Sequence, residues 1–266
     1  MQQTMQGPTT VLAASMTGEQ SVRVAAAGDL HVDESGREAV ATAVAAMERD
    51  ADLILLAGDL TTHGEPEQGA ILADACRGVR TPVIAVLGNH DLHADREDEL
   101  SDVLRGAGIV VLDRRHSTAV VADRRVGVAG VKGFIGGFRD HTLPDFGEPS
   151  LRRLYAETGE EVDALAAGLR AIAACPLRIA LMHYAPTCET LVGEPSEIWS
   201  FLGSERMAAP LLEHRPDLVL HGHAHAGRLQ GSLQGIPVYN VSIPVMGQDY
   251  WLFELAAARS LSSTLH

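Results

Sequence analysis

Five short apolar runs, each followed by polar side chains that bind metals, constrain the fold of this chain more than any other feature. The runs span residues 22–27, 53–57, 83–87, 179–182 and 218–220. They are followed by Gly28-Asp29-Leu30-His31, Gly58-Asp59, Gly88-Asn89-His90-Asp91, His183 and Gly222-His223-Ala224-His225. Near-continuous apolar runs of this length are typical of strands buried on both faces. Ligands of open α/β sheets bind outside the carboxyl ends of the strands, so we expect the five endings to meet at one place.

The five endings contain three carboxylates, one amide, five imidazoles and no thiolate. Oxygen and imidazole ligands suit Mn²⁺, Fe or Zn²⁺ and argue against a thiolate-rich structural zinc site. Residues i and i+2 of an extended chain point the same way, so Asp29 and His31 can face one side, as can His223 and His225. One such motif alone is more often an ordinary turn or cap. All of them together, each after an apolar run, indicate a catalytic metal centre.

The pattern between the runs predicts the fold class. Helical periodicity over residues 36–49, 65–77 and 95–105 alternates with the first strands, which is typical of βαβ units. Later residues predict a hairpin over 118–131, a long helix over 148–174 that Gly159 could interrupt, and antiparallel strands over 227–233, 237–242 and 250–255. We therefore predict an α/β fold: a four-layer α/β/β/α sandwich of two mixed sheets packed face to face, with helices outside and the metal site at the carboxyl ends of strands.

Length and composition bound the domain organisation. The chain has 266 residues, of which 46% are hydrophobic but only 4% aromatic, so the core must consist mainly of Ala, Val, Leu and Ile. We assign residues 21–258 to a single domain and residues 259–266 to a C-terminal tail. Residues 1–20 are polar and lack the basic and apolar regions of a secretory signal, so we expect a flexible N-terminal tail there.

Charge and cysteine content narrow the partners. The net charge of −14 disfavours stable binding to nucleic acid or to anionic membranes, although bound cations would locally invert this field. No apolar stretch reaches the roughly 18 residues of a membrane span. Cys76, Cys175 and Cys188 show no paired spacing, which predicts reduced thiols and a cytoplasmic location. We expect a small-molecule substrate and leave formation of a homo-oligomer open.

Two long loops and several polar residues remain ambiguous at this point. Loops of the length of residues 133–149 and 186–203 are usually functional, and packed surface loops are the equal alternative. We expect His221, which precedes the last motif, to support the site or the core rather than to bind metal. The basic residues considered as contacts to an anionic ligand, with ordinary surface charge slightly favoured for each, are Lys132, Arg139 and Arg228.

Taken in order, the motifs resemble those of the calcineurin-like metallophosphoesterases, over roughly residues 22–245. The fold of that family is a two-sheet sandwich flanked by helices, in agreement with the pattern described above. The resemblance implies seven metal ligands in two groups that share one carboxylate: Asp29, His31 and His225 for the first metal, Asn89, His183 and His223 for the second, and Asp59 between them.

The implied chemistry is hydrolysis of phosphate esters. Two cations about 3.5–4 Å apart need a shared anionic ligand, and a metal-bridging hydroxide would be the nucleophile. His90 would be the general acid near the leaving group, and Asp91 its orienting partner. We expect two metal ions per chain, drawn from Mn, Fe and Zn, with Mn²⁺ as the ion that supports activity.

Departures from the family narrow the subfamily. Thr62 stands where purple acid phosphatases have the tyrosine that gives their iron chromophore, and His63 replaces the arginine of protein Ser/Thr phosphatases. The remaining resemblance is to bacterial phosphodiesterase-type members, so we predict hydrolysis of diesters. The alternatives are a phosphomonoesterase or nuclease with the same centre, although no basic stripe suggests a nuclease. A non-catalytic scaffold on this fold is less consistent with a complete ligand set.

Overall fold

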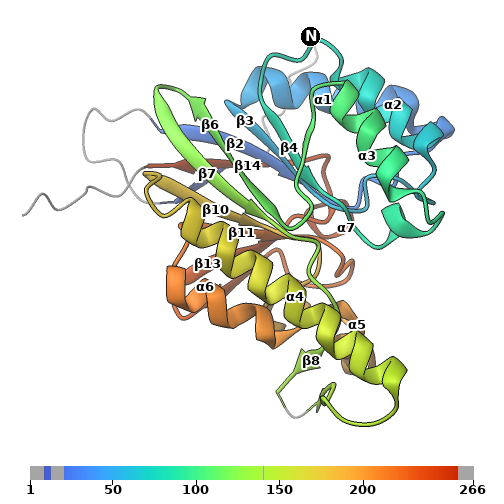
Figure 1. The fold of residues 1–266 in the computed structure, drawn as a ribbon. Coiled ribbons are helices and arrows are strands. Elements are labelled where there is room, and N and C mark those ends of the chain that lie inside the picture. Colours follow the sequence, from blue (N-terminus) through green and yellow to red (C-terminus); the bar gives the residue numbers. More distant parts are fainter. Residues whose placement is uncertain (1–8, 13–20, 140, 257–266) are drawn as a thin grey trace, which may run out of the picture.

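A computed structural model of the chain describes residues 9–12, 21–139 and 141–256. Two six-stranded sheets pack face to face, and helices cover both outer faces (Figure 1). The predicted four-layer sandwich is therefore confirmed. Within the segment predicted as an N-terminal tail, strand β1 (Thr9–Leu12) is described, and the rest of residues 1–20 lies outside the described residues, as does the predicted tail at 259–266.

The first sheet contains the three strands that precede the N-terminal motifs. Its order is β1, β14 (Trp251–Leu255), β2 (Val22–Ala27), β3 (Leu53–Ala57), β4 (Val83–Val86) and β5 (Val110–Val111). Strands β2 to β5 are parallel, so the polar residues after β2, β3 and β4 emerge at the same edge.

The second sheet repeats this plan with other segments. Its order is β12 (Gln230–Leu233), β13 (Ile236–Asn240), β11 (Leu218–His221), β10 (Leu177–Leu181), β7 (Arg124–Gly130) and β6 (Arg115–Val121). The four central strands are parallel, and the two outer ones are antiparallel to their neighbours. The carboxyl ends of β10 and β11 lead into the two C-terminal histidine motifs.

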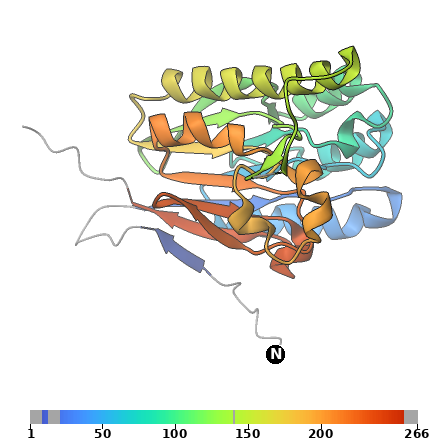
Figure 2. The same ribbon diagram turned by 90° about the horizontal axis from the view of Figure 1, so that it is seen from below.

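Helices form the outer layers. The first sheet is covered by α1 (Arg37–Asp50), α2 (Pro66–Cys76) and α3 (Glu97–Gly106), and the second by α4 (Pro149–Ala171) and α6 (Ala208–His214), as the two views of the ribbon show (Figures 1 and 2). Pro149 occupies the first turn of α4, where its missing N–H costs nothing, and the helix continues without a break through Gly159.

Short elements complete the chain. They are the 3₁₀ turns η1 (Glu34–Gly36), η2 (His90–Leu92), η3 (Cys188–Leu191), η4 (Ser196–Ile198) and η5 (Glu205–Met207), the helices α5 (Trp199–Leu202) and α7 (Ile243–Met246), and the two-stranded sheet of β8 (Gly137–Phe138) and β9 (His141–Thr142). The loop over residues 133–149 thus contains two short strands, and the loop over residues 186–203 contains short helical turns.

The layer between the sheets consists of aliphatic side chains with two aromatic rings. Tyr239 and Phe253 pack edge to face, with ring centroids 4.9 Å apart. These two residues come from β13 and β14, which the sequence predicted as antiparallel strands. Strand β14 is antiparallel, as predicted, but it belongs to the first sheet, where its partner is β2. There it covers the free edge of β2 and buries Phe253 and Leu255 between the sheets.

Candidate metal centre

Sharp backbone turns at the strand ends aim the predicted ligands inward. Asp29, His31, Asp59 and His223 have φ angles of 58°, 45°, 48° and 70°, in the left-handed region that non-glycine residues rarely occupy. Such conformations cost free energy and persist where the surrounding structure enforces them, often at functional sites. Each turn takes the chain out of its sheet and leaves the side chain at the common edge.

Two glycines make room for the buried carboxylates. A β-carbon on Gly88 would overlap the Asp59 carboxylate, and one on Gly222 would overlap the Asp29 carboxylate. Asp29 and Asp59 are 3% and 1% exposed. The glycines of these motifs therefore serve close approach of the backbone to an acidic side chain rather than flexibility.

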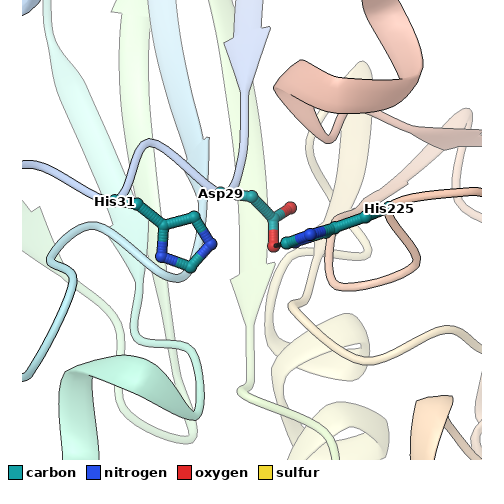
Figure 3. A group of neighbouring side chains, drawn as sticks. All are labelled: Asp29, His31 and His225. Atoms are coloured by element: carbon teal, nitrogen blue, oxygen red, sulfur yellow. Dashed lines mark hydrogen bonds and ion pairs between the residues drawn. The ribbon is translucent and has the colours of Figure 1, made fainter.

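One group of candidate ligands consists of Asp29, His31 and His225 (Figure 3). One ligand atom from each of the three side chains lies within 4.8 Å of the others. The His31 ring points toward Asp29, and Nε2 of His225 lies 2.8 Å from Oδ1 of Asp29. The structure thus brings together residues from β2 and β11 that are almost 200 positions apart.

Asp59 occupies the middle of the site. Its Oδ2 lies 3.9 Å from Nε2 of His31 and 4.0 Å from Nε2 of His90, whereas its Oδ1 lies 3.3 Å from Nε2 of His183. The same carboxylate belongs to a further group of potential ligands with His183 and His223. Its two oxygens thus face different sets of imidazoles, as a bridging ligand requires.

The surroundings of His183 favour a cation. The Nδ1 atom lies 2.9 Å from the carbonyl oxygen of Ala57, so Nδ1–H donates there and a neutral ring has only a lone pair on Nε2. That Nε2 faces Oδ1 of Asn89 at 2.9 Å and Oδ1 of Asp59 at 3.3 Å. Three acceptors that converge in a fully buried position need a proton or a cation among them. The donor set therefore fits a metal ion.

His223 is held by the long loop that follows His183. Its Nε2 lies 3.1 Å from the carbonyl oxygen of Phe201, and donation to this carbonyl leaves Nδ1 free to bind a metal. The ring of Tyr184 stacks beside it at a centroid distance of 4.4 Å. Burial lowers the pKa of His223 to about 3, so the imidazole is neutral, as a metal ligand must be.

The Asp29 carboxylate is ionised despite its burial. Burial alone would raise its pKa, but the hydrogen bond from His225, the electrostatic interaction with the His183 imidazole and the backbone N–H of His223 together lower it to about 2. The same hydrogen bond raises the pKa of His225. A buried anion surrounded by imidazoles is the local charge pattern expected of a metal ligand.

His90 lies at the rim of this centre. Its backbone N–H donates to Oδ1 of Asp59 at 2.8 Å, and its Nδ1 lies 2.8 Å from the carbonyl oxygen of Thr62. Its side chain is 34% exposed, and its ring meets that of His31 at a centroid distance of 4.5 Å. Its Nε2 atom faces Oδ2 of Asp59 at 4.0 Å, and His31, Asp59 and His90 form another group of potential ligands.

The partner of the His90 ring differs from the one that the sequence suggested. Asp91 was expected to orient His90, but its buried carboxylate accepts from the backbone N–H groups of Leu60, Thr61 and Gly88 and from the Thr61 hydroxyl. These four donors occupy the carboxylate and tie the loop after β4 to the loop after β3. The carbonyl of Thr62 takes the position at His90 Nδ1.

Sequence reasoning missed the groups that hold the imidazoles. Three of them are the backbone carbonyls of Ala57, Thr62 and Phe201, and every residue has a carbonyl, so no side-chain pattern could reveal them. Tyr184 was also missed, although it directly follows His183. A large aromatic next to a ligand on the same strand end is a signal that could have been considered.

Two of the ambiguous residues have structural partners. His221 is fully buried, with Nδ1 2.8 Å from the carbonyl of Gly222 and Nε2 2.8 Å from Oγ1 of Thr190, which agrees with a supporting role. Lys132 lies over the ring of Phe134 at 4.2 Å and 3.6 Å from the carboxylate of Glu157. Its ammonium group also lies 5.3 Å from the ring centroid of Tyr184, which packs beside His223.

The comparisons with known proteins agree with this site. A sequence model of the calcineurin-like phosphoesterases matches residues 22–227, most of the chain. The chain belongs to the calcineurin-like phosphoesterase family. No curated protein matches it. The family match and the clustered His and Asp side chains support metal-dependent hydrolysis of phosphate esters at a centre suited to two divalent cations.

Solved structures show how this calcineurin-like phosphoesterase fold recurs. The phosphopantetheinyl hydrolase PptH from Mycobacterium tuberculosis is 18% identical, with a TM-score of 0.62 over 88% of this chain and 96% of that one. GAP50, the anchor in the inner membrane complex of Plasmodium, is 13% identical, with a TM-score of 0.52 over 85% of this chain and 73% of that one. At these identities the likeness concerns the fold.

Among the helices described here, none combines the length and apolar character of a bilayer span.

Proposed function

We propose that the protein hydrolyses phosphodiesters with two cations held by seven side chains. Asp29, His31 and His225 would hold one cation, Asn89, His183 and His223 the other, with Asp59 shared between them. The observation that carries this proposal is the central position of Asp59, whose two oxygens face His31 and His183 separately. When bound, such a pair of cations lowers the pKa of water and offsets charge on the phosphoryl oxygens. The imidazole, carboxylate and amide donors suit Mn²⁺.

His90 would donate the proton to the departing alkoxide. The Thr62 carbonyl holds the proton on Nδ1, so Nε2 is the atom that can lose and regain one. The backbone bond from His90 to Asp59 fixes the ring beside the cations without using Nε2. Asp91 would act more remotely, because it fastens together the loops that carry Asp59 and His90.

Charge supports a diester substrate over a monoester. A diester carries one negative charge, whereas a monoester carries close to two at neutral pH. The chain has a net charge of −14, and the Glu194 carboxylate beside the site accepts the backbone N–H of Ala226, the residue after His225, at 2.6 Å. An acidic rim repels a dianion more strongly than a monoanion.

The test is parallel hydrolysis of bis(p-nitrophenyl) phosphate and p-nitrophenyl phosphate, after loading with Mn²⁺, Fe²⁺ or Zn²⁺ and again with a chelator. We expect turnover that the chelator abolishes, that Mn²⁺ restores best and that favours the diester. Preference for the monoester would retain the centre but assign a phosphomonoesterase. Cleavage of plasmid DNA in place of either ester would assign a nuclease. Folded, metal-loaded protein that turns over none of these would favour the scaffold alternative.

A further inference from the structure

A recess opens directly beside the metal centre, between α1 and α7. Its volume is about 110 Å³, and its floor is formed by Leu30, His31 and Val32, the segment that leaves β2. His31 therefore takes part in both places, since its ring points toward Asp29 in the metal centre (Figure 3). The recess and the candidate site thus lie next to each other, with His31 as the residue that they share.

Small residues at the start of α1 keep this recess open. Gly36, which precedes the helix, and Ala39 and Ala43 of α1 line one wall, and the opposite wall includes Ile243 of α7. Larger apolar side chains at the alanines would fill the space and bury more apolar surface, which normally stabilises a protein. The chain instead leaves a ring-sized volume empty next to a metal-ligand candidate.

The floor of the recess is fixed by backbone hydrogen bonds. His31 N–H donates to the carbonyl of Asp59 at 3.0 Å, and Val32 N–H donates to that of Leu60 at 3.0 Å. On the α7 side, Ile243 N–H donates to the carbonyl of Gly28 at 3.0 Å. The recess is therefore preformed, which reduces the conformational entropy that a ligand must overcome.

We propose that the recess binds the ester group of the substrate that remains on phosphorus, and that this group is uncharged, apolar and about the size of a phenyl ring. This inference rests on the proposed phosphodiesterase function. His90 does not line the recess, so the leaving oxygen, which needs a proton from His90, lies elsewhere. An apolar cavity of about 150 Å³ accommodates benzene. The recess, of about 110 Å³, is open to solvent at the exposed residues Ala39 and Asp249, so it can take a ring that stays partly exposed.

Charge at the mouth restricts the occupant further. Asp249 is the one carboxylate among the residues that line the recess, and its side chain is exposed. An acidic group there disfavours a carboxylate or second phosphate on the bound ester group. The occupant is accordingly neutral, and an added carboxylate should be rejected.

The test uses two substrates with the same leaving group: methyl p-nitrophenyl phosphate and phenyl p-nitrophenyl phosphate. We expect the Mn²⁺-loaded protein to prefer the phenyl ester by about tenfold or more in kcat/KM, the scale on which apolar pockets discriminate. In Ala39→Leu, leucine fills the recess, so the preference should fall below about threefold while turnover of the methyl ester stays within about twofold.

The matched control is Ala41→Leu. Ala41 is exposed on the same helix and does not line the recess, because two residues correspond to more than half a helical turn. This variant should retain the preference for the phenyl ester. A second variant, Asp249→Asn, should raise kcat/KM for a 4-carboxyphenyl ester by about threefold or more without changing that for the phenyl ester.

The outcomes separate this inference from the proposed function. Equal use of the methyl and phenyl esters by the wild-type protein would overturn the recess proposal and leave phosphodiester hydrolysis intact. A phenyl preference that survives Ala39→Leu, in a variant that still turns over the methyl ester, would overturn it as well. Absence of turnover with both esters would refute the proposed function itself.

Discussion

The two halves of the metal centre are built in different ways. On the side of the first sheet, ligands follow directly on parallel strands, and adjacent strand ends bond to each other. Asp29 N–H donates to the carbonyl of Gly58, and His31 N–H to that of Asp59, both at 3.0 Å. The sheet that creates these positions also holds them. This half of the centre is therefore a direct product of strand order.

On the side of the second sheet, a long loop holds the ligands from outside. The carbonyl of Phe201 contacts the His223 ring, the Glu194 carboxylate accepts from Ala226, and Thr190 contacts His221. Each of these loop residues lies between positions 186 and 203, so it is distant in the sequence from the residue that it contacts. The difference teaches that Asp29, His31 and Asp59 are held by the sheet itself, whereas His223, a ligand proposed for the second cation, depends on how firmly this loop is seated.

Asp59 joins the two halves, so its loss should have the largest effect. In Asp59→Ala, both cation positions lose their shared anion, and we expect neither metal to be retained and activity to fall by about 10³-fold or more. Metal content after gel filtration, measured by inductively coupled plasma mass spectrometry, checks this. Asp163→Ala, an exposed carboxylate on α4, is the control and should retain both metals. Two tightly bound metals in Asp59→Ala would refute the bridging role.

His90 belongs to the first half but should act on the leaving group rather than on metal binding. His90→Ala should lose about 10²- to 10⁴-fold in kcat with alkyl esters, whose alkoxides need a proton, and far less with p-nitrophenyl esters. Metal content should stay at the wild-type level. His93→Ala is the matched control, because its exposed ring stacks on His90 at 4.3 Å. Equal losses on both classes of ester would show that His90 is not the acid.

The same contrast explains what the sequence could predict. Ligands of the first half were predictable because apolar runs locate the strands and the residues after parallel strands must meet. The strand over 250–255 was predicted, but its position beside β2 was not, since β2 lies more than 200 residues away in the chain. The support of His90 by Thr62 and of His223 by Phe201 involves backbone carbonyls, which leave no trace in the side-chain pattern. Sequence motifs therefore identify the metal-ligand candidates better than they identify the backbone groups that orient those side chains.

Weakening the contacts of the loop over residues 186–203 should lower the affinity for the second metal more than that for the first. Thr190→Val removes the hydroxyl that pairs with the buried Nε2 of His221, and an unpaired buried polar group costs about 1–3 kcal/mol. We also expect affinity for the second equivalent of metal to fall by about tenfold, since supporting contacts tune ligands on this scale. Urea unfolding and metal titration by calorimetry measure the two effects.

Thr42→Val provides the control for the loop. Thr42 also donates a hydroxyl hydrogen bond, to the carbonyl of Glu38, but on the exposed side of α1. It should leave both metal-binding steps unchanged. If Thr190→Val weakened both equivalents of metal alike, the separation between a sheet-built and a loop-built half would not hold.

The cysteines should have the smallest effect on the centre, because none of them belongs to a group of potential metal ligands in the described residues. We expect Cys76→Ser, Cys175→Ser and Cys188→Ser combined to keep kcat within about twofold of the wild-type value, provided that the protein folds and retains its metals. A folded, metal-loaded but inactive variant would show that a thiol takes part in the reaction.

Cys76 should nevertheless affect stability at high pH. Burial in the layer between α2 and the first sheet raises the pKa of its thiol from 9.0 to about 11. Between these values the unfolded chain releases the proton while the folded protein keeps it, so this contribution to stability is complete below pH 9 and is lost as pH rises toward 11. The free energy of unfolding should fall by about 1 kcal/mol more in the wild-type protein than in Cys76→Ala between pH 8 and pH 10. Urea unfolding of both proteins at the two pH values measures this difference, and equal falls would show that the thiol titrates as it does in the unfolded chain.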